Sequence, residues 1–241
     1  MTIFATIAGV TLRALLGRRR TILLLILAGM PILLGLLVRA NDEELSNVGP
    51  TLEGFVVRVV LPLIALVFGT ASLGSELDDG TAIHILTKPI PRSTIVLAKI
   101  AVAGTLTAAL VVPSTLISGI LLGGADATTM AVTFAFALAV LIGSYLYVAI
   151  FLVLSAVTSR GLFIGLAYSL IWEGVLAGLL PGSQIFSVRE YLGGIAATFE
   201  PSAVGDSVVG SGGFLYAAVA FVLAAILGSA RLSTYEIRGT D

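Results

Sequence analysis

The polar residues that could do chemistry are few, and most of them gather in one stretch between two apolar runs. "GSELDDGTAIHILTKPIPRSTIVLAK", residues 74–99, holds the only histidine, His84, and both lysines, Lys88 and Lys99. The chain has no cysteine, which excludes thiolate metal sites, and a single histidine excludes a histidine-cluster site. It contains no G-x4-G-K-[S/T] phosphate loop and no H-E-x-x-H motif. The sequence therefore predicts no catalytic centre and no metal site on this chain.

Residues 74–94, called the inner loop here, have the pattern of a short helix with a stiff exit. Residue types that favour helix N-caps come first: Asp78, Asp79 and Thr81. "TAIHIL" then places apolar side chains at Ile83 and Leu86 on one edge of the helix. Pro89 and Pro91 end it, because proline lacks the backbone donor and restricts the residue before it. Such a helix is suited to docking in the groove of a partner protein and to receiving a push from it.

Two further ionisable residues lie within apolar runs. Glu173, in "SLIWEGVLAGLL", lies well inside such a run, where a charge is costly and usually faces a protein interior or water. Arg58 follows the start of another run and is the nearest plausible cation. Two interpretations stay open. Glu173 and Arg58 belong to a substrate pathway or gate, or Glu173 belongs to a structural ion pair or marks a membrane boundary.

The elements that must position these residues are long apolar segments. Apolar residues make up 58% of the chain, charged residues 11%, and the mean hydropathy is +1.10, which is typical of a membrane protein. A helix needs about 20 residues to cross about 30 Å of hydrocarbon. Six runs approach or exceed that length: 21–38, 55–73, 95–122, 130–157, 162–180 and 208–230. We therefore predict an all-α polytopic membrane protein with six spans in a single transmembrane domain, residues 1–241.

Two segments outside the spans also carry structural signals. Residues 1–20 place apolar side chains at near-helical spacing before a basic cluster, which indicates an amphipathic helix in the headgroup layer. Residues 181–207 are too polar to span and too rich in large apolar residues for a free linker. We expect short helices there that enter the outer leaflet, with a loosely ordered loop as the alternative.

Orientation follows from the distribution of basic residues. With the N-terminus in the cytoplasm, ten basic residues lie on the inner side: Arg13, Arg18, Arg19, Arg20, Lys88, Arg92, Lys99, Arg160, Arg231 and Arg238. Three lie on the outer side: Arg39, Arg58 and Arg189. The positive-inside bias therefore predicts a protein of the cytoplasmic membrane with both termini in the cytoplasm. The net charge of −1 does not point to a nucleic-acid partner.

The inner loop also resembles that of a known family. Glu76, Gly80–Thr81, Leu86, Pro89, Arg92 and Lys99 reproduce an acidic-x3-G-T-x4-L-x2-P-x2-R-x6-K pattern. This pattern resembles the loop of the ABC type-2 permeases, the six-span subunits of ATP-driven exporters. The architecture of nearly the whole chain is similar to that family. His84 is a departure, because the family often has a leucine-rich segment at that place.

The resemblance implies that the inner loop is a coupling helix that docks on a separate cytoplasmic ATPase. The residues it assigns to coupling are Glu76, Asp78, Asp79, Gly80, Thr81, Ile83, Leu86, Pro89 and Arg92. It further implies two ATPase copies that bind ATP and magnesium, no cofactor on this chain, and a second permease that is a copy or a paralogue. The outer helices of residues 181–207 would form part of the exit gate.

Three functions stay open from the sequence. The first is the permease subunit of an exporter, where nearly uncharged spans favour an amphipathic or hydrophobic cargo. The second is an ion-gradient-driven secondary transporter, for which paired intramembrane ionisable residues are expected and only Glu173 qualifies. The third is a non-transporting scaffold that transmits mechanical force or supports assembly.

Overall fold

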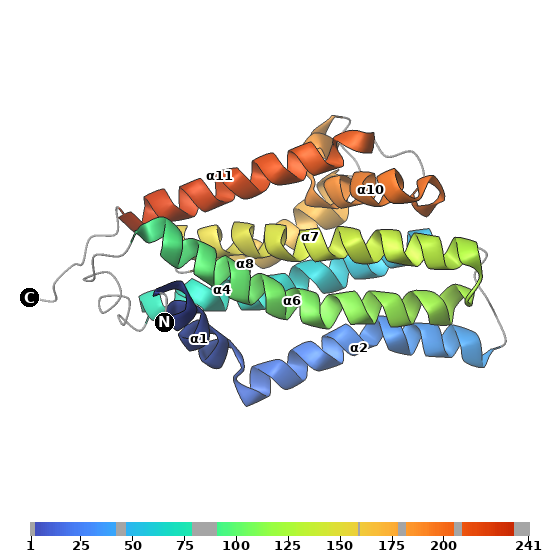
Figure 1. Cartoon of the computed structure of the whole chain (residues 1–241), viewed down its shortest axis with the longest axis horizontal. Coiled ribbons are helices and arrows are strands. Elements are labelled where there is room, and N and C mark those ends of the chain that lie inside the picture. The colour runs from blue at the N-terminus through green and yellow to red at the C-terminus, as the bar shows by residue number, and fades with distance from the viewer. Residues whose placement is uncertain are drawn as a thin grey trace, which may run out of the picture.

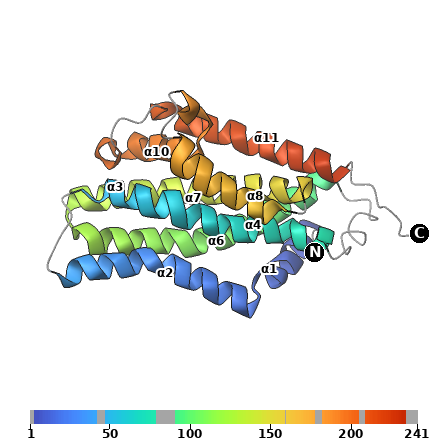
Figure 2. The same ribbon diagram turned by 180° about the vertical axis from the view of Figure 1, so that it is seen from behind.

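The computed structural model describes residues 3–41, 47–78, 91–158, 160–177, 182–204 and 209–233. Every element in those residues is a helix, as predicted. The helices lie side by side along one long axis (Figures 1 and 2). The beginning of α1 and the end of α11 lie at the same end of this bundle, which we call the α1 end. The opposite end carries α10 and is called the α10 end.

The N-terminal part of the chain forms a short helix and a long one. α1 (Ile3–Leu15) packs its buried residues Thr11 and Leu15 against α6 and α4. The backbone is extended at Gly17, and α2 (Arg18–Ala40) begins directly after it. Arg18, Arg19 and Arg20, predicted to lie at the end of the interfacial segment, therefore form the first turn of α2. Long basic side chains at the start of a membrane helix can reach the headgroup layer.

The second apolar run changes its helical type along its length. It begins with α3 (Gly49–Thr51), continues as the π-helix η1 (Leu52–Val60) and ends as α4 (Leu61–Asp78). Arg58 lies in η1, in the half of this run nearer the α10 end. After the inner loop, α6 (Arg92–Gly123) returns along the bundle.

A tight connection joins α6 to α7 (Ala127–Val157), so that the two helices pack as antiparallel neighbours. Gly124 ends α6 with φ +80°, a backbone conformation that favours glycine. Asp126 then caps α7, because its carboxylate accepts the backbone N–H of Thr129 at 3.0 Å. This bond favours the ionised form and lowers the pKa of Asp126 below its usual range.

The fifth apolar run is a composite helix. α8 (Gly161–Ala167) continues as the π-helix η2 (Tyr168–Leu176). A group of short elements follows: η3 (Ser183–Phe186), α10 (Val188–Phe199), η4 (Pro201–Ala203) and η5 (Gly210–Gly212). α11 (Gly213–Ser233) completes the described chain. The segment 181–207 thus contains short helices in its described part, as the sequence predicted.

α7 lies at the centre of the bundle and contacts α4, α6, α8, α10 and α11. Its side chains Phe136, Tyr147 and Phe151 are among the largest completely buried ones in the described chain. Small residues let the neighbours approach closely. A methyl group on Gly69 of α4, for example, would lie about 3 Å from the Phe151 Cβ and the Val148 carbonyl oxygen. This close packing is how helices associate without a hydrophobic drive from water.

Five of the described helices are long and apolar enough to cross a membrane: Arg19–Ala40, Gly49–Leu73, Arg92–Gly123, Ala127–Val157 and Gly213–Ser233. They correspond to the predicted spans one, two, three, four and six. The predicted fifth span corresponds to a shorter apolar helix, Gly161–Leu176. The six-span arrangement therefore remains a prediction, and the fifth segment is the element on which it depends.

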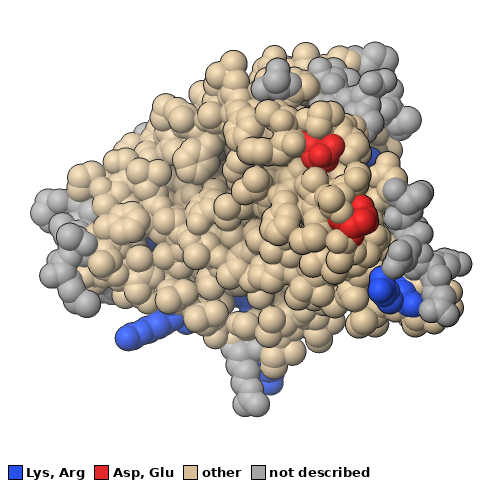
Figure 3. Space-filling model, turned by 45° about the vertical axis from the view of Figure 1, so that its right-hand side comes forward, with Lys and Arg blue, Asp and Glu red and all other residues tan. Residues whose placement is uncertain are grey.

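The outside of the bundle is largely apolar. α2 and α11 expose most of their apolar side chains, with Leu23 and Leu215 about two-thirds exposed. The face in Figure 3 carries few charged side chains. Exposed leucine, isoleucine and phenylalanine over whole helices require a lipid or protein environment. The bundle is a multi-pass membrane domain.

Candidate functional site

The inner loop lies mostly outside the described residues, but both of its flanks are described. Glu76 and Asp78 belong to the last turns of α4, and Arg92 is the first residue of α6. The other predicted coupling residues lie outside the described residues: Asp79, Gly80, Thr81, Ile83, Leu86 and Pro89. The end of α4 and the start of α6 both lie at the α1 end, so the loop connects two neighbouring helices of the bundle.

A buried lysine joins these two helices. Lys99, near the start of α6, is completely buried, and its Nζ donates a hydrogen bond of 2.5 Å to the Ser72 carbonyl oxygen of α4. A charged donor makes a stronger bond than a neutral one, and water does not compete with it in this position. Lys99 therefore joins α6 to α4, the two helices on either side of the inner loop.

The second buried ionisable residue, Glu173, lies in η2 toward the α10 end. Its Oε1 accepts hydrogen bonds from the Tyr168 hydroxyl at 2.7 Å and the Val188 backbone N–H at 2.8 Å. Its Oε2 accepts from the Ser187 hydroxyl at 2.5 Å and the Arg189 backbone N–H at 3.4 Å. The side chain is 0% exposed. Four donors therefore meet a carboxylate that no water reaches.

Two of these donors show what the carboxylate does. Val188 and Arg189 are the first two residues of α10, whose first N–H groups have no partner within the helix. Glu173 supplies acceptors for them and so acts as the N-cap of α10 from a different helix. The π-helical winding contributes to this geometry, because a π-helix relates residues i and i+5 and thereby brings Tyr168 beneath Glu173.

The start of α10 is also held by its side chains. The Arg189 guanidinium lies 3.9 Å from the Glu53 carboxylate of η1 and 2.8 Å from the Glu190 carboxylate. Arg189 is 6% exposed. Each π-helix thus supplies a carboxylate to the first turn of α10. Glu53 of η1 contacts the Arg189 side chain, and Glu173 of η2 accepts backbone N–H groups. These contacts unite the second apolar run, the fifth apolar run and α10.

The predicted partnership of Glu173 with Arg58 does not correspond to a contact in the structure. Hydroxyl and amide donors surround Glu173, whereas the buried Nε of Arg58 has no hydrogen-bond partner among the described residues. The environment of Glu173 is that of a structural acceptor. Ionic pairing in this region joins Arg189 to Glu53 and Glu190 instead.

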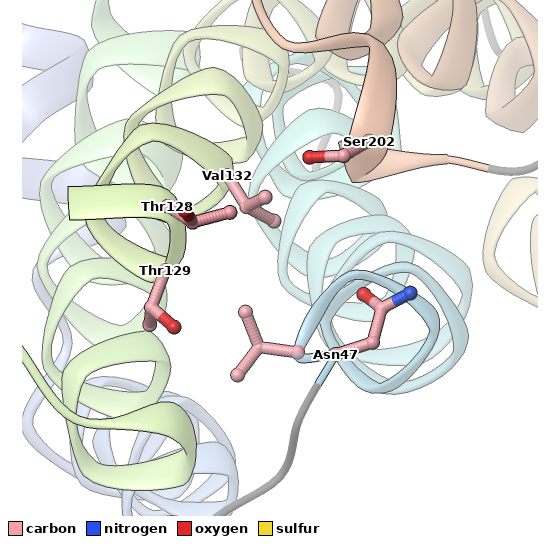
Figure 4. Close-up of a pocket in the computed structure, with 6 residues that line it drawn as sticks. Asn47, Thr128, Thr129, Val132 and Ser202 are labelled. Carbon is pink, nitrogen blue, oxygen red and sulfur yellow. The ribbon is translucent and has the colours of Figure 1, made fainter. Parts of the chain in front are cut away.

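A small open pocket of about 130 Å³ lies at the α10 end (Figure 4). It is formed where the start of α3, the start of α7 and η4 meet, and Asn47, Thr128, Thr129 and Ser202 give it a polar lining. Binding sites for drug-sized molecules have volumes of about 300–1,000 Å³. This pocket is therefore too small to be a chamber for an amphipathic cargo.

Sequence reasoning did not identify the contribution of Ser187 and gave Lys99 only a place in a motif. A signal for Ser187 was present, because "SVRE" is an S-x-x-E sequence at the start of a helix, the pattern of a capping box. Its pairing with Glu173, fourteen residues earlier, had no such signal, because it depends on how η2 and α10 pack.

Comparison with known proteins agrees with the architecture. A family model described as "ABC-2 family transporter protein" matches residues 16–190 of the chain. The match begins at the turn before α2 and ends in the first turn of α10, so it includes the inner loop, Arg58, Lys99 and Glu173. No curated protein matches the chain.

Proposed function

Because the chain belongs to the ABC-2 family of transporter membrane proteins, we propose that it is the permease subunit of an exporter driven by ATP hydrolysis on a separate ATPase chain. The observation that carries this proposal is the family match over residues 16–190, which includes the inner loop and the two helices that flank it. The membrane-spanning helices support a role in transport. The sequence has no phosphate-binding loop, so ATP and magnesium would bind to the partner.

We assign ATPase docking to the inner loop. Its acidic start, Glu76, Asp78 and Asp79, would face basic residues of the partner, and its apolar edge, Ile83 and Leu86, would enter a groove. Gly80, Thr81, Pro89 and Arg92 would shape the entry and exit of this segment. The bond from Lys99 to Ser72 supports the assignment, because it would deliver a push on the loop to α4 and α6 together.

We infer that cargo moves along a path between two permease chains. One pocket in the described part of the chain, of about 130 Å³, is too small for a lipid, a peptide antibiotic or a drug, so this pocket is not the path. Its outward-facing helices are apolar and large enough to line a path with a second copy or a paralogue. A largely uncharged lining favours an amphipathic or hydrophobic cargo exported across the cytoplasmic membrane.

Glu173 is proposed as a gate residue that positions α10 and does not touch the cargo. Its carboxylate is fully buried and already accepts four hydrogen bonds. Arg58 remains the residue for which we propose contact with the pathway, because it lies in an apolar run and is only half-buried. An anionic group on the cargo would compensate its charge.

The docking assignment is tested by two pairs of substitutions in the inner loop. Ile83→Asp with Leu86→Asp places two charges in the proposed contact and should abolish co-purification with a co-expressed ATPase subunit that binds the native chain. The control is His84→Asp with Lys88→Asp, which adds two acids on the opposite side of a helix with 3.6 residues per turn and should preserve binding. Unchanged ATPase binding and export by the Ile83/Leu86 variant would refute the docking assignment.

A further inference from the structure

We propose that α10 has an exchangeable N-terminal cap. In the observed arrangement Glu173 of η2 caps the helix; when η2 and α10 separate, Ser187 and Glu190 cap it instead. The two residues that would take over are present in the sequence as an unused capping box. The exchange needs neither ATPase nor cargo, whereas its use as an outer gate rests on the proposed function.

The first step of the argument is that the present cap comes from another element. Ser187 occupies the N-cap position of α10, but its hydroxyl makes no capping bond to that helix. The hydroxyl donates to Glu173 Oε2, and Glu173 accepts the N–H groups of Val188 and Arg189. The cap therefore exists only while η2 and α10 are in contact, and all three hydrogen bonds break together when they separate.

The second step is that the chain can replace this cap locally. Ser187, Val188, Arg189 and Glu190 form the S-x-x-E sequence in which serine accepts an N–H of the first turn and glutamate accepts the serine N–H. Both side chains are engaged elsewhere in the observed arrangement, Ser187 with Glu173 and Glu190 with Arg189. A rotation of the serine side chain alone converts its hydroxyl from a donor to Glu173 into an acceptor from α10.

The third step concerns where the chain can bend at this end of α10, a bend that must also break the contact of Arg189 with Glu53. Gly182, between η2 and α10, has φ +84°, a conformation that other residues rarely adopt, and its surroundings would leave room for a side chain. The other half of α10 is fixed, because Gly194 packs directly on the backbone of Gly210 and Gly213. Separation would therefore open the start of α10 while its later turns stay on α11.

The consequence is a reduced cost of separation. An ordinary buried cap that breaks leaves unpaired N–H groups, which are costly in apolar surroundings. Here Ser187 restores one of these bonds, and Glu173 keeps its bond to the Tyr168 hydroxyl. The Ser187 N–H, which Glu190 would accept in a capping box, donates to the Gln184 carbonyl oxygen in the observed arrangement. The local cap thus offsets part of the cost of separation, to which the lost contact of Arg189 with Glu53 adds.

The test measures separation and helix integrity independently. The full chain is purified and placed in lipid nanodiscs, where both membrane faces are accessible and the native sequence contributes no thiol. Separation is read from the rate at which a water-soluble maleimide labels Val188→Cys, a position that is 2% exposed. Integrity of α10 is read from hydrogen exchange of its amides by mass spectrometry. Val140→Cys in α7 is the buried reference, and Ala125→Cys is the exposed one.

We expect Glu173→Leu to accelerate labelling of the cysteine at 188 about 5- to 30-fold, the factor that corresponds to a cap of about 1–2 kcal/mol. Glu173→Gln should give an intermediate rate, since its amide oxygen still accepts one backbone N–H. The α10 amides should stay protected in both variants. Adding Ser187→Ala to Glu173→Leu should then increase the hydrogen exchange of the α10 amides about fivefold or more. In the same Glu173→Leu protein, Ser187→Thr in place of Ser187→Ala should keep these amides protected.

Two results would overturn the proposal. Labelling at position 188 that does not change in Glu173→Leu would show that Glu173 does not hold α10. Equal amide exchange in Glu173→Leu with and without Ser187→Ala would show that no second cap forms. Should Glu173→Leu also expose the cysteine at 140 and thus unfold the chain, the same comparison is made with Glu173→Gln. Each readout is made without the ATPase, so its outcome is separate from that of the docking test.

Discussion

At the scale of single residues, the buried ionisable side chains of this chain connect helices. Lys99 joins α6 to α4 at the α1 end, and Glu173 joins η2 to α10 at the α10 end. Each is completely buried, and each uses its partner's backbone, a carbonyl oxygen for Lys99 and N–H groups for Glu173. A bond to the backbone requires no particular residue type at the partner position, so the sequence carries no signal for these bonds.

Lys99→Met tests the first connection. Methionine keeps the apolar stem of lysine in its packing and removes the charged donor to Ser72. We expect the free energy of unfolding to fall by about 1.5–3 kcal/mol, the contribution of a hydrogen bond to a charged group. SDS titration of the purified chain measures it. Leu97→Met, at an exposed position two residues earlier, is the control and should leave the value unchanged.

Asp126 gives a prediction about pH. The pKa of Asp126 in the folded chain is below the usual value, because its carboxylate accepts the Thr129 N–H. The stabilisation from this bond is therefore complete above the pKa of the unfolded chain, about 4, and is lost as the pH falls through the pKa of the folded chain. Thermal unfolding midpoints below pH 4 should therefore fall more steeply for the native chain than for Asp126→Asn. Parallel curves for the two proteins would exclude this contribution.

At the scale of elements, the fifth apolar run and α10 form one unit. η2 ends close to the first turn of α10, and α10 in turn packs on α7 and on the beginning of α11. The contact with α11 is close, because a methyl group on Gly194 would overlap the carbonyl oxygen of Gly210. A movement of the end of η2 would thus reach α10 directly, and α10 contacts the beginning of α11.

Adjacent glycines of α10 provide a matched test of this packing. Gly194→Ala should destabilise the chain by about 1–3 kcal/mol, because the new methyl group meets backbone atoms that cannot rotate away. Gly193→Ala meets its nearest atom, in Val204, at 3.7 Å and should be neutral or stabilising by up to about 1 kcal/mol, since alanine favours helix. SDS titration of both variants decides, and equal effects would contradict the packing argument.

At the scale of the whole molecule, the helix ends next to predicted inner segments lie at one end of the bundle. The helix ends next to predicted outer segments lie at the other. The start of α1, the end of α4, the start of α6 and the end of α11 share the α1 end, as the positive-inside argument requires of segments on one side of a membrane (Figures 1 and 2). The structure thus agrees with the relative sidedness. The absolute orientation is a prediction from the arginine and lysine distribution.

Cysteine labelling in intact cells tests this orientation. Asn41 and Ala125 are exposed at the α10 end, and Gly17 is exposed near the α1 end. Cysteines introduced at 41 and 125 should react with a membrane-impermeant maleimide, and a cysteine at 17 should react only after the cells are opened. The reverse pattern would place the N-terminus outside and would remove the inner loop from the reach of a cytoplasmic ATPase.

The sequence by itself determined the all-helical membrane class, the positions of five long helices and the place of the inner loop. These follow from local quantities, namely the length of apolar runs, proline and cap residues, and charge counts. It also indicated that Glu173 has a structural or functional role, because placing a charged side chain in an apolar membrane segment costs free energy. The predicted first span, 21–38, lies within α2, which begins at Arg18 directly after the extended Gly17.

Only the tertiary structure decided what the buried charges contact. Arg58 was the nearest cation to Glu173 by predicted topology, yet the carboxylate meets Tyr168, Ser187 and the backbone of α10. The two π-helices and the contact of Lys99 with Ser72 were likewise not evident. The physical reason is common to all of them. A buried polar group takes the partner that the packing brings to it, and the packing of helices distant in the sequence leaves no periodic signal along the chain.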